Sequence, residues 1–391
     1  MTEMGALMKE YFNKKSKVTV LPVQQFLKCF NRDVILSAPI KIEIAITNSC
    51  NQNCSHCSNA NSIAHDINQN ISFEWINDVI SCNPFYCVIT GGEPLLHPQF
   101  LDIIKLIKSK GIIVKILSNG TLWNKDIALK LKEIGFTNND CIQISLDADN
   151  EYDYILRRGN NFFRQVVNNI KLLSEEKLSV EVHYVPTRNT IEQVEKVYKI
   201  ANENGAMYFS TATLAPLGRA IYLNEVDAIK LVEREIRLIE MSKQMNTSYL
   251  GSLLGENCTY MHLIQDFSDV RLSRPNKSKT YRCAAGTSMA YIKENGEVYS
   301  CVYATEAPFK PMGNLERLCF THIWKQVIKE GYWLGLDVSG TECENCSMWG
   351  VCTGGCLGIS SSSIGFIKAG HDTRCKKIKE NYYYGKNQRE V

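Results

Sequence analysis

The stretch KIEIAITNSCNQNCSHC (41–57) decides the fold. Its first half, 41–47, alternates isoleucine with other residues, and this period of two predicts a strand with one buried face. Its second half places Cys50, Cys54 and Cys57 in a Cys-x3-Cys-x2-Cys spacing directly after that strand. A short buried strand that runs straight into a cysteine loop predicts a site at the strand's carboxyl end.

Downstream of this stretch the chain alternates strand and helix patterns. Further strands rich in β-branched residues are predicted at 86–90, 112–118, 141–146, 178–185 and 206–211. Helical periodicity is predicted over 98–110 and 190–204, each ending at a glycine. Parallel neighbours need a crossover between them, so six β–α units imply a parallel sheet. The fold class is therefore α/β, and the number of units predicts a partial (β/α)6 barrel of the TIM type.

The flanking regions differ from this barrel pattern. A long charged amphipathic helix is predicted over 220–250, and from 283 onward periodicity fades while cysteine, glycine and short loops take over. This shift predicts a small second domain held together by metal rather than by a broad apolar core. The expected organisation is an N-terminal extension (1–40), the barrel (41–225), a helical bridge (226–282), a cysteine-rich iron–sulfur domain (283–375) and a C-terminal tail (376–391).

Composition excludes several classes of function. Lys+Arg 44 against Asp+Glu 41 leaves a net charge of +3 in 391 residues, which offers no electrostatic argument for nucleic acid or an anionic membrane. No apolar run approaches the roughly 18 residues of a membrane span. The N-terminus carries no secretory signal, so a cytoplasmic location is expected. In that reducing compartment, 16 cysteines indicate metal or redox chemistry rather than disulfides.

The first cysteine cluster has the spacing of an iron–sulfur site. Three thiolates on one tight loop can hold three irons of a 4Fe–4S cluster and leave the fourth iron open to a small molecule. A structural zinc ion is the alternative, although zinc usually takes four ligands in Cys-x2-Cys pairs. Cys29, Cys82, Cys87 and Cys141 stand apart from this cluster and are expected to be packed thiols.

Gly91-Gly92-Glu93-Pro94 follows the second predicted strand, and with the cysteine loop it makes the sequence resemble the radical S-adenosylmethionine superfamily. The resemblance implies that the open iron binds S-adenosylmethionine. Reductive cleavage would then give methionine and a 5′-deoxyadenosyl radical that abstracts hydrogen from a substrate. A flavodoxin or ferredoxin is expected as the reductant.

The resemblance also implies which residues contact S-adenosylmethionine. They are His56, Gly91, Gly92, Glu93, Pro94, Ser118, Asn119, Ser145, Arg158 and Leu214. Glu93 would receive the methionine ammonium, since a carboxylate pairs with an ammonium. Arg158 would bind the methionine carboxylate, with its neighbour Arg157 as the alternative. His56 stands where most members carry an aromatic residue that packs on the adenine, and Leu214 is either an adenine contact or a core residue.

The second cysteine cluster resembles the SPASM extension of this superfamily. It runs Cys283, Cys301, Cys343, Cys346, Cys352, Cys356 and Cys375, with a Gly-x4-Cys and a CxxCxxxxxCxxxC pattern. By resemblance, Cys283, Cys301 and Cys356 would hold auxiliary cluster I, with Cys258, Cys319 or an open iron as the fourth position. Cys343, Cys346, Cys352 and Cys375 would hold auxiliary cluster II. A zinc ribbon at 343–356 is the alternative, and the expected total is three 4Fe–4S clusters.

Members with this extension mostly modify peptides, so the leading hypothesis is oxidative maturation of a ribosomally synthesised precursor peptide, through a thioether or carbon–carbon crosslink or another C–H functionalisation. The alternatives are dehydrogenation or epimerisation of a small molecule such as a sugar or aminoglycoside, and sulfatase-maturase-like oxidation of Cys or Ser. Sulfatase maturases carry an Asp where Val302 stands here. A non-catalytic electron carrier would need no S-adenosylmethionine motif. About 40 residues precede the first strand, too few for the peptide-recognition domain that many members carry, so recognition of a leader would need a separate protein, or none takes place.

Overall fold

The computed structural model describes residues 37–60, 69–223, 226, 228–250, 283–305, 308–330, 341, 343–344, 355–365, 367 and 372. The predictions for Cys258, Cys346, Cys352 and Cys375 lie outside these residues, as do those for the extension up to residue 36 and for the tail 376–391. The proposed domain boundaries stay predictions.

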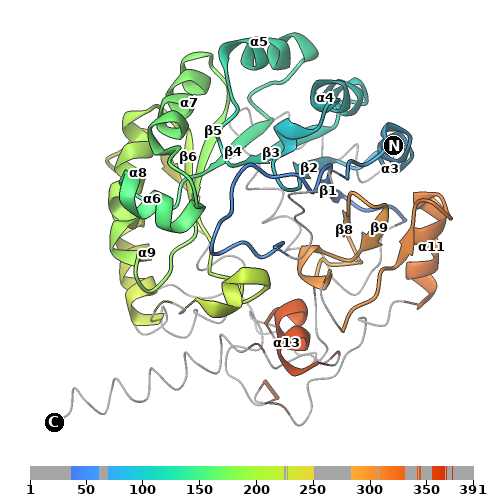
Figure 1. Cartoon of the computed structure of the whole chain (residues 1–391). Coiled ribbons are helices and arrows are strands. Elements are labelled where there is room, and N and C mark those ends of the chain that lie inside the picture. Colours follow the sequence, from blue (N-terminus) through green and yellow to red (C-terminus); the bar gives the residue numbers. More distant parts are fainter. Residues whose placement is uncertain are drawn as a thin grey trace.

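Six parallel strands form the centre of the fold (Figure 1). They are β1 (Lys41–Ala45), β2 (Tyr86–Thr90), β3 (Ile113–Ser118), β4 (Cys141–Ser145), β5 (Val180–Tyr184) and β6 (Tyr208–Thr211). Each strand pairs with the next one along the chain, in parallel register throughout. All six predicted strands are confirmed, and so is the fold class of a partial α/β barrel.

Helices cover the outer face of this sheet. They are α3 (Phe73–Ile80), α4 (Phe100–Ser109), α5 (Lys125–Ile134), α7 (Phe163–Glu175) and α8 (Val194–Glu203), while α6 (Glu151–Arg158) packs against α7 and reaches the loop after β1. In Figure 1, α3, α4, α5, α7 and α8 follow one another in an arc around the strands. Isoleucines at alternate positions of β1 pack into the core beneath them. Both helices predicted from periodicity are confirmed, with slightly shorter bounds.

The inner face of the sheet is partly polar. Lys115 of β3 and Glu181 of β5 form a buried ion pair of 2.7 Å across the intervening strand β4. Ser210 of β6 donates a hydrogen bond of 2.5 Å to the same carboxylate. The inward side chains of these non-adjacent strands therefore meet, as the curvature of a barrel requires.

The C-terminal strands continue the same sheet. β8 (Met289–Ile292) pairs in parallel with β1, and β9 (Glu297–Tyr299) and β10 (Gly313–Asn314) follow in antiparallel register. Helix α11 (Phe320–Glu330) packs against α3, and Phe320, Ile323 and Trp324 belong to the main hydrophobic core. The expectation that this region depends on metal instead of an apolar core is therefore wrong for residues 283–330, because its strands and helix extend the barrel's own sheet and core.

The predicted helix over 220–250 is also too long. The chain forms a 3-10 turn, η3 (Gly218–Tyr222), then α9 (Ala228–Ser242), then the strand β7 (Ser248–Tyr249) beside β6. The Thr247 hydroxyl donates to the Ala206 carbonyl oxygen at 2.6 Å, and the Asn202 side chain accepts from the backbone N–H of Asn246. These tertiary hydrogen bonds hold the last residues extended. In the described residues, no helix is both long enough and apolar enough to cross a bilayer.

Candidate active site

The first cysteine loop follows β1 and is held from two sides. The backbone N–H groups of Asn53 and Ser55 donate to the carbonyl oxygens of Arg158 and Arg157, at 3.2 and 2.9 Å. On the other side, the Arg219 side chain donates to the Cys54 carbonyl oxygen at 2.8 Å. Helix α6 and the 3-10 turn η3 therefore clamp the loop at the carboxyl ends of the strands.

The thiols of this loop are half-buried and lie within electrostatic reach of one another. Burial raises the pKa of Cys50 to about 12, and it raises the pKa of Cys57 as well. Their thiolates are thus disfavoured until a metal replaces the protons, so metal binding must release protons. Among the described residues, no group of three His, Cys, Asp or Glu side chains is close enough to bind one metal ion. Ligands of a cluster stand on separate irons and do not need that proximity.

Gly91 and Gly92 lie directly against the end of β1. Gly91 has a φ of +144°, and a Cβ atom there would meet the Thr47 carbonyl oxygen at 2.3 Å; at Gly92 it would meet that of Ser49 at 2.1 Å. The backbone N–H of Gly92 donates to Thr47 at 2.8 Å, and that of Glu93 to Ser49 at 2.7 Å. The close approach of the chain that leads into the cysteine loop therefore explains both glycines. The prediction from the sequence is instead that they contact S-adenosylmethionine.

Substituting Gly92 by Ala should therefore be strongly destabilising. Its Cβ would overlap backbone atoms that no side-chain rotation can move, and overpacking of this kind costs about 1–3 kcal/mol or more. We expect a lower midpoint of unfolding in urea and less iron bound per chain. Gly365→Ala is the control for the loss of a glycine, because its Cβ would meet nothing within 4 Å; its φ of +79° already disfavours Ala, so the comparison is a conservative one. Equal stability of the two variants would contradict this account.

Glu93 is completely buried and ties β2 to β3. Its carboxylate accepts hydrogen bonds from the Ser118 hydroxyl at 2.9 Å, the backbone N–H of Asn119 at 2.7 Å and that of Leu95 at 3.3 Å. Burial raises the pKa of Glu93 to about 7, against the lowering effect of these donors. A cation nearby would stabilise the ionised form of a carboxylate that is buried in this way. Pro94 begins the 3-10 turn η1 (Pro94–Leu96) that follows.

Ser118 and Asn119, two of the predicted contacts of S-adenosylmethionine, are also engaged within the protein. The Ser118 hydroxyl accepts from the Trp123 ring N–H and from the backbone of Gly120, both at 3.0 Å. The Asn119 amide donates to the Asn51 side chain at 2.7 Å. The end of β3 is thus bound to both the Glu93 segment and the cysteine loop. Their predicted contacts with the cofactor stay predictions.

Asp147 connects three separate segments at this mouth, and no role was assigned to it from the sequence. Its carboxylate contacts His56 Nε2 at 3.0 Å, pairs with the Arg158 guanidinium and accepts from the backbone N–H of Val185 at 2.8 Å. Burial alone would raise the pKa of Asp147, but Arg158 and His56 hold it well below its ordinary value. Burial also lowers the pKa of His56 to about 4, so the ring is neutral near pH 7. The position of an acidic residue at the end of a buried strand was the available signal.

Several nitrogen atoms around the cysteine loop are buried without a hydrogen-bond partner in the structure. They are Nδ1 of His56, Nε and one terminal nitrogen of Arg157, Nε of Arg158 and one terminal nitrogen of Arg219. Such atoms are costly unless a ligand satisfies them. The three guanidinium groups outnumber the two carboxylates of Asp147 and Glu93, so this mouth suits an anionic group.

The remaining predicted contacts lie in the same region. Ser145 ends β4, half-buried, opposite His183 in the register with β5. Leu214 is 5% exposed and follows β6. Neither position decides between a cofactor contact and packing.

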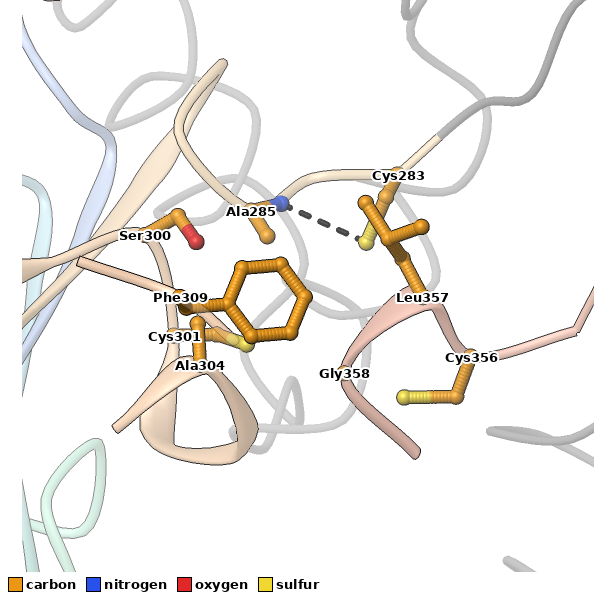
Figure 2. Close-up of a pocket in the computed structure, with 9 residues that line it drawn as sticks. All are labelled: Cys283, Ala285, Ser300, Cys301, Ala304, Phe309, Cys356, Leu357 and Gly358. Carbon is orange, nitrogen blue, oxygen red and sulfur yellow. Dashed lines mark hydrogen bonds between the residues drawn. The ribbon is translucent and has the colours of Figure 1, made fainter. Parts of the chain in front are cut away.

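Three predicted auxiliary ligands come together in a second site. Cys283, Cys301 and Cys356 line one pocket of about 360 Å³, part of it open to solvent, with Ala285, Ser300, Ala304, Phe309, Leu357 and Gly358 (Figure 2). They come from the loop before β8, from the turn after β9 and from the residue that precedes α13 (Leu357–Ile364). Burial raises the pKa of Cys301, and the other two cysteines act on it in the same direction. The gathering of residues separated by 73 positions, 283 to 356, supports the predicted ligand set.

The other cysteines are placed as follows. Cys319 is exposed, near the Thr321 hydroxyl, and is not among the residues that line this pocket. Cys343 is half-buried, and its predicted partners in auxiliary cluster II lie outside the described residues. Cys87 and Cys141 are buried and Cys82 is half-buried, each away from both sites, in agreement with packed thiols.

Comparison with known proteins agrees with this architecture. The family model of the radical SAM superfamily matches residues 44–201, and that of the SPASM iron–sulfur cluster-binding domain matches residues 283–347. The chain therefore belongs to the radical SAM superfamily and carries a SPASM domain. It is consequently an enzyme whose cofactors are S-adenosylmethionine and 4Fe–4S clusters, auxiliary clusters included.

Individual relatives are similar over most of the chain. The mycofactocin maturase MftC of Mycobacterium tuberculosis is 25% identical over 90% of this chain and 86% of its own length. The AdoMet-dependent heme synthase of Methanosarcina barkeri is 24% identical over 74% of this chain and 83% of its own. Among solved structures, Streptococcus suis SuiB bound to its precursor peptide SuiA superposes with a TM-score of 0.71 at 18% identity, covering 88% of this chain and 77% of that one.

The donor sets fit these cofactors. The half-buried thiols after β1 and the three thiols of the apolar pocket are the soft ligands that iron–sulfur clusters take. The unpartnered guanidinium nitrogens beside the first loop suit the carboxylate of an amino acid.

Proposed function

We propose that the protein is a radical SAM maturase that oxidatively modifies a ribosomally synthesised peptide. The observation that carries the proposal is the pocket of Cys283, Cys301 and Cys356, which is separate from the first cysteine loop. A second redox site suits a net two-electron oxidation, since one electron must leave the substrate after hydrogen abstraction. The relatives named as a maturase and as a protein bound to a precursor peptide support a peptide as the substrate.

The proposed roles at the barrel mouth follow from the contacts there. When bound, the cluster at Cys50, Cys54 and Cys57 supplies the electron that cleaves S-adenosylmethionine to methionine and a 5′-deoxyadenosyl radical. Glu93 provides the negative charge for the methionine ammonium. Of the two neighbouring arginines, we assign the methionine carboxylate to Arg157, because two of its nitrogens are buried and unpartnered while Arg158 is paired with Asp147. This reverses the preference for Arg158 drawn from the sequence.

Glu93→Gln should weaken the binding of S-adenosylmethionine by about ten-fold or more, because a hydrogen bond to a charged group contributes roughly 1.5–3 kcal/mol. The measurement is a binding titration on reconstituted protein with its iron content verified. Ser118→Ala is the matched control, since it removes one partner of Glu93 and no charge. If Ser118→Ala weakens binding as much as Glu93→Gln does, the charge of Glu93 is not the cause, and binding depends on the end of β3, where Ser118 is itself a predicted contact.

The proposed function itself is tested with a synthetic peptide, taken from a short reading frame beside the gene if one is found there. Reduced protein, S-adenosylmethionine and the synthetic peptide are incubated anaerobically, and the peptide is examined by mass spectrometry. Loss of two hydrogens from the peptide, in step with the 5′-deoxyadenosine formed, is expected. An unmodified peptide despite continuing 5′-deoxyadenosine production would reject it as the substrate.

A small-molecule substrate is the second candidate. It is favoured by the similarity to a relative named as a heme synthase, which extends over 74% of this chain. Hydrogen transfer offers a direct discrimination: with deuterated peptide, deuterium should appear in 5′-deoxyadenosine only if the peptide is the substrate. The peptide proposal also includes two partners. One is a reductant such as a flavodoxin or ferredoxin, and the other is a separate peptide-recognition protein.

A further inference from the structure

Asp147 connects elements that are distant in the sequence. It follows β4 with none of its surface exposed, and its carboxylate reaches His56 of the cysteine loop, Arg158 of α6 and the backbone of Val185 after β5. The contact with His56 is specific to this chain's histidine, because an aromatic hydrocarbon ring at that position has no nitrogen to offer. One buried carboxylate therefore holds the loop, the helix and the sheet together.

Arg158 contacts the cysteine loop in two ways. Its guanidinium donates to the sulfur of Cys54 at 3.5 Å, and its carbonyl oxygen accepts from the backbone N–H of Asn53 at 3.2 Å. The guanidinium is buried, so its charge depends on Asp147 as a counter-ion. Without Asp147, the guanidinium would lose the carboxylate with which it is directly paired, and nothing so close would hold it beside this sulfur.

We infer that Asp147 is the positioning residue of the first cysteine loop, and that it acts by holding Arg158 against the sulfur of Cys54. This inference rests on the proposed assignment of Cys54 as a cluster ligand. A hydrogen bond and a positive charge beside a ligand sulfur stabilise the reduced, more negative form of a cluster and so raise its reduction potential. Arg158 thereby makes the cluster easier to reduce, and Asp147 keeps Arg158 in place.

The test compares Asp147→Asn, Arg158→Gln and the double variant in the reconstituted full chain. The midpoint potential is measured by electron paramagnetic resonance in a redox titration, using the signal that changes when S-adenosylmethionine is added. Arg164→Gln is the matched control, because it removes the same charge from an exposed pair with Glu151 and has no contact with the loop. A second readout, hydrogen exchange of the metal-free chain, follows the amides of Asn53 and Ser55, which donate to the carbonyl oxygens of α6.

Arg158→Gln should shift the potential to a more negative value, and Arg164→Gln should leave it unchanged. Asp147→Asn should also shift it to a more negative value, although removing a negative charge would by itself shift it the other way. The double variant should be no more negative than Arg158→Gln, since residues that act through one another are not additive. In both single variants the Asn53 and Ser55 amides should exchange at least about ten-fold faster.

A more positive potential in Asp147→Asn would overturn the inference, because Asp147 would then act only through its charge. Fully additive shifts would overturn it as well. If Asp147→Asn binds no iron, hydrogen exchange of the Asn53 and Ser55 amides in Arg158→Gln becomes the deciding measurement. An unchanged exchange rate there rejects the positioning role. None of these measurements uses a peptide substrate, so failure of the peptide proposal leaves the inference standing. Absence of the paramagnetic resonance signal in the wild-type protein would instead reject the cluster assignment itself.

Discussion

Replacing Cys50, Cys54 and Cys57 together by Ala is expected to abolish the cleavage of S-adenosylmethionine and to leave about eight of about twelve irons, if three clusters of four irons are present. The reason is that, in the part of the chain that the structure describes, this loop alone offers thiols at the barrel mouth, where the buried guanidinium nitrogens lie. The barrel core is built of isoleucine and other apolar side chains beneath the helices, so the fold should survive. The measurements are 5′-deoxyadenosine after reduction, and iron and sulfide per chain.

Cys82→Ala is the control for the loss of a thiol, because the Cys82 sulfur lies at the end of α3 and donates to the Val79 carbonyl oxygen, away from the loop. It should retain all its iron and its cleavage activity. Loss of every iron in the triple variant, or zinc in place of iron in the wild-type chain, would contradict the assignment. Air should inactivate the wild-type protein, since an iron without a protein ligand is exposed to oxidants.

Replacing Cys283 and Cys301 together by Ala should abolish product while S-adenosylmethionine cleavage continues. The pocket that these residues share with Cys356 is separate from the loop after β1, and cleavage requires the loop. We therefore expect uncoupled turnover, in which 5′-deoxyadenosine accumulates in the presence of reductant and substrate without any modified substrate. Cys319→Ala is the control, because Cys319 is exposed and does not line the pocket.

Two outcomes would change this division of labour. Normal product formation by the double variant would show that this pocket takes no part in the oxidation. Complete loss of cleavage, with the first cluster still visible by spectroscopy, would show that the two sites depend on each other. Unfolding is not the expected cause of a loss of cleavage, because β8 pairs with β1 and Trp324 is buried in the main core. Tryptophan fluorescence of the double variant, to which the buried Trp324 contributes, checks that the variant is folded.

Local patterns sufficed for the elements of the barrel and for the candidate ligands. The alternation of isoleucines in 41–47 predicted β1, and the five later strands were found by the same reasoning, because a strand's period of two is written directly in its residues. Cysteine spacing likewise singled out the loop, whereas the set of Cys283, Cys301 and Cys356 came from the resemblance to the SPASM extension; these three line one pocket, and their role as ligands stays a prediction. Pattern reasoning failed at Ser248–Tyr249, where two residues pair with β6 and carry too little periodicity to be recognised.

The sequence by itself determined the class of this protein: six β–α units, a cysteine loop at the first strand's end and a second cysteine set are all local features of the chain. Only the tertiary structure decided that β8 extends the barrel sheet, that Gly91 and Gly92 serve close contact with β1, and that Asp147 joins His56 to Arg158. The physical reason is that these are contacts between residues far apart along the chain. Spacing and periodicity record what one element does, whereas a buried carboxylate finds its partners only when separate elements meet.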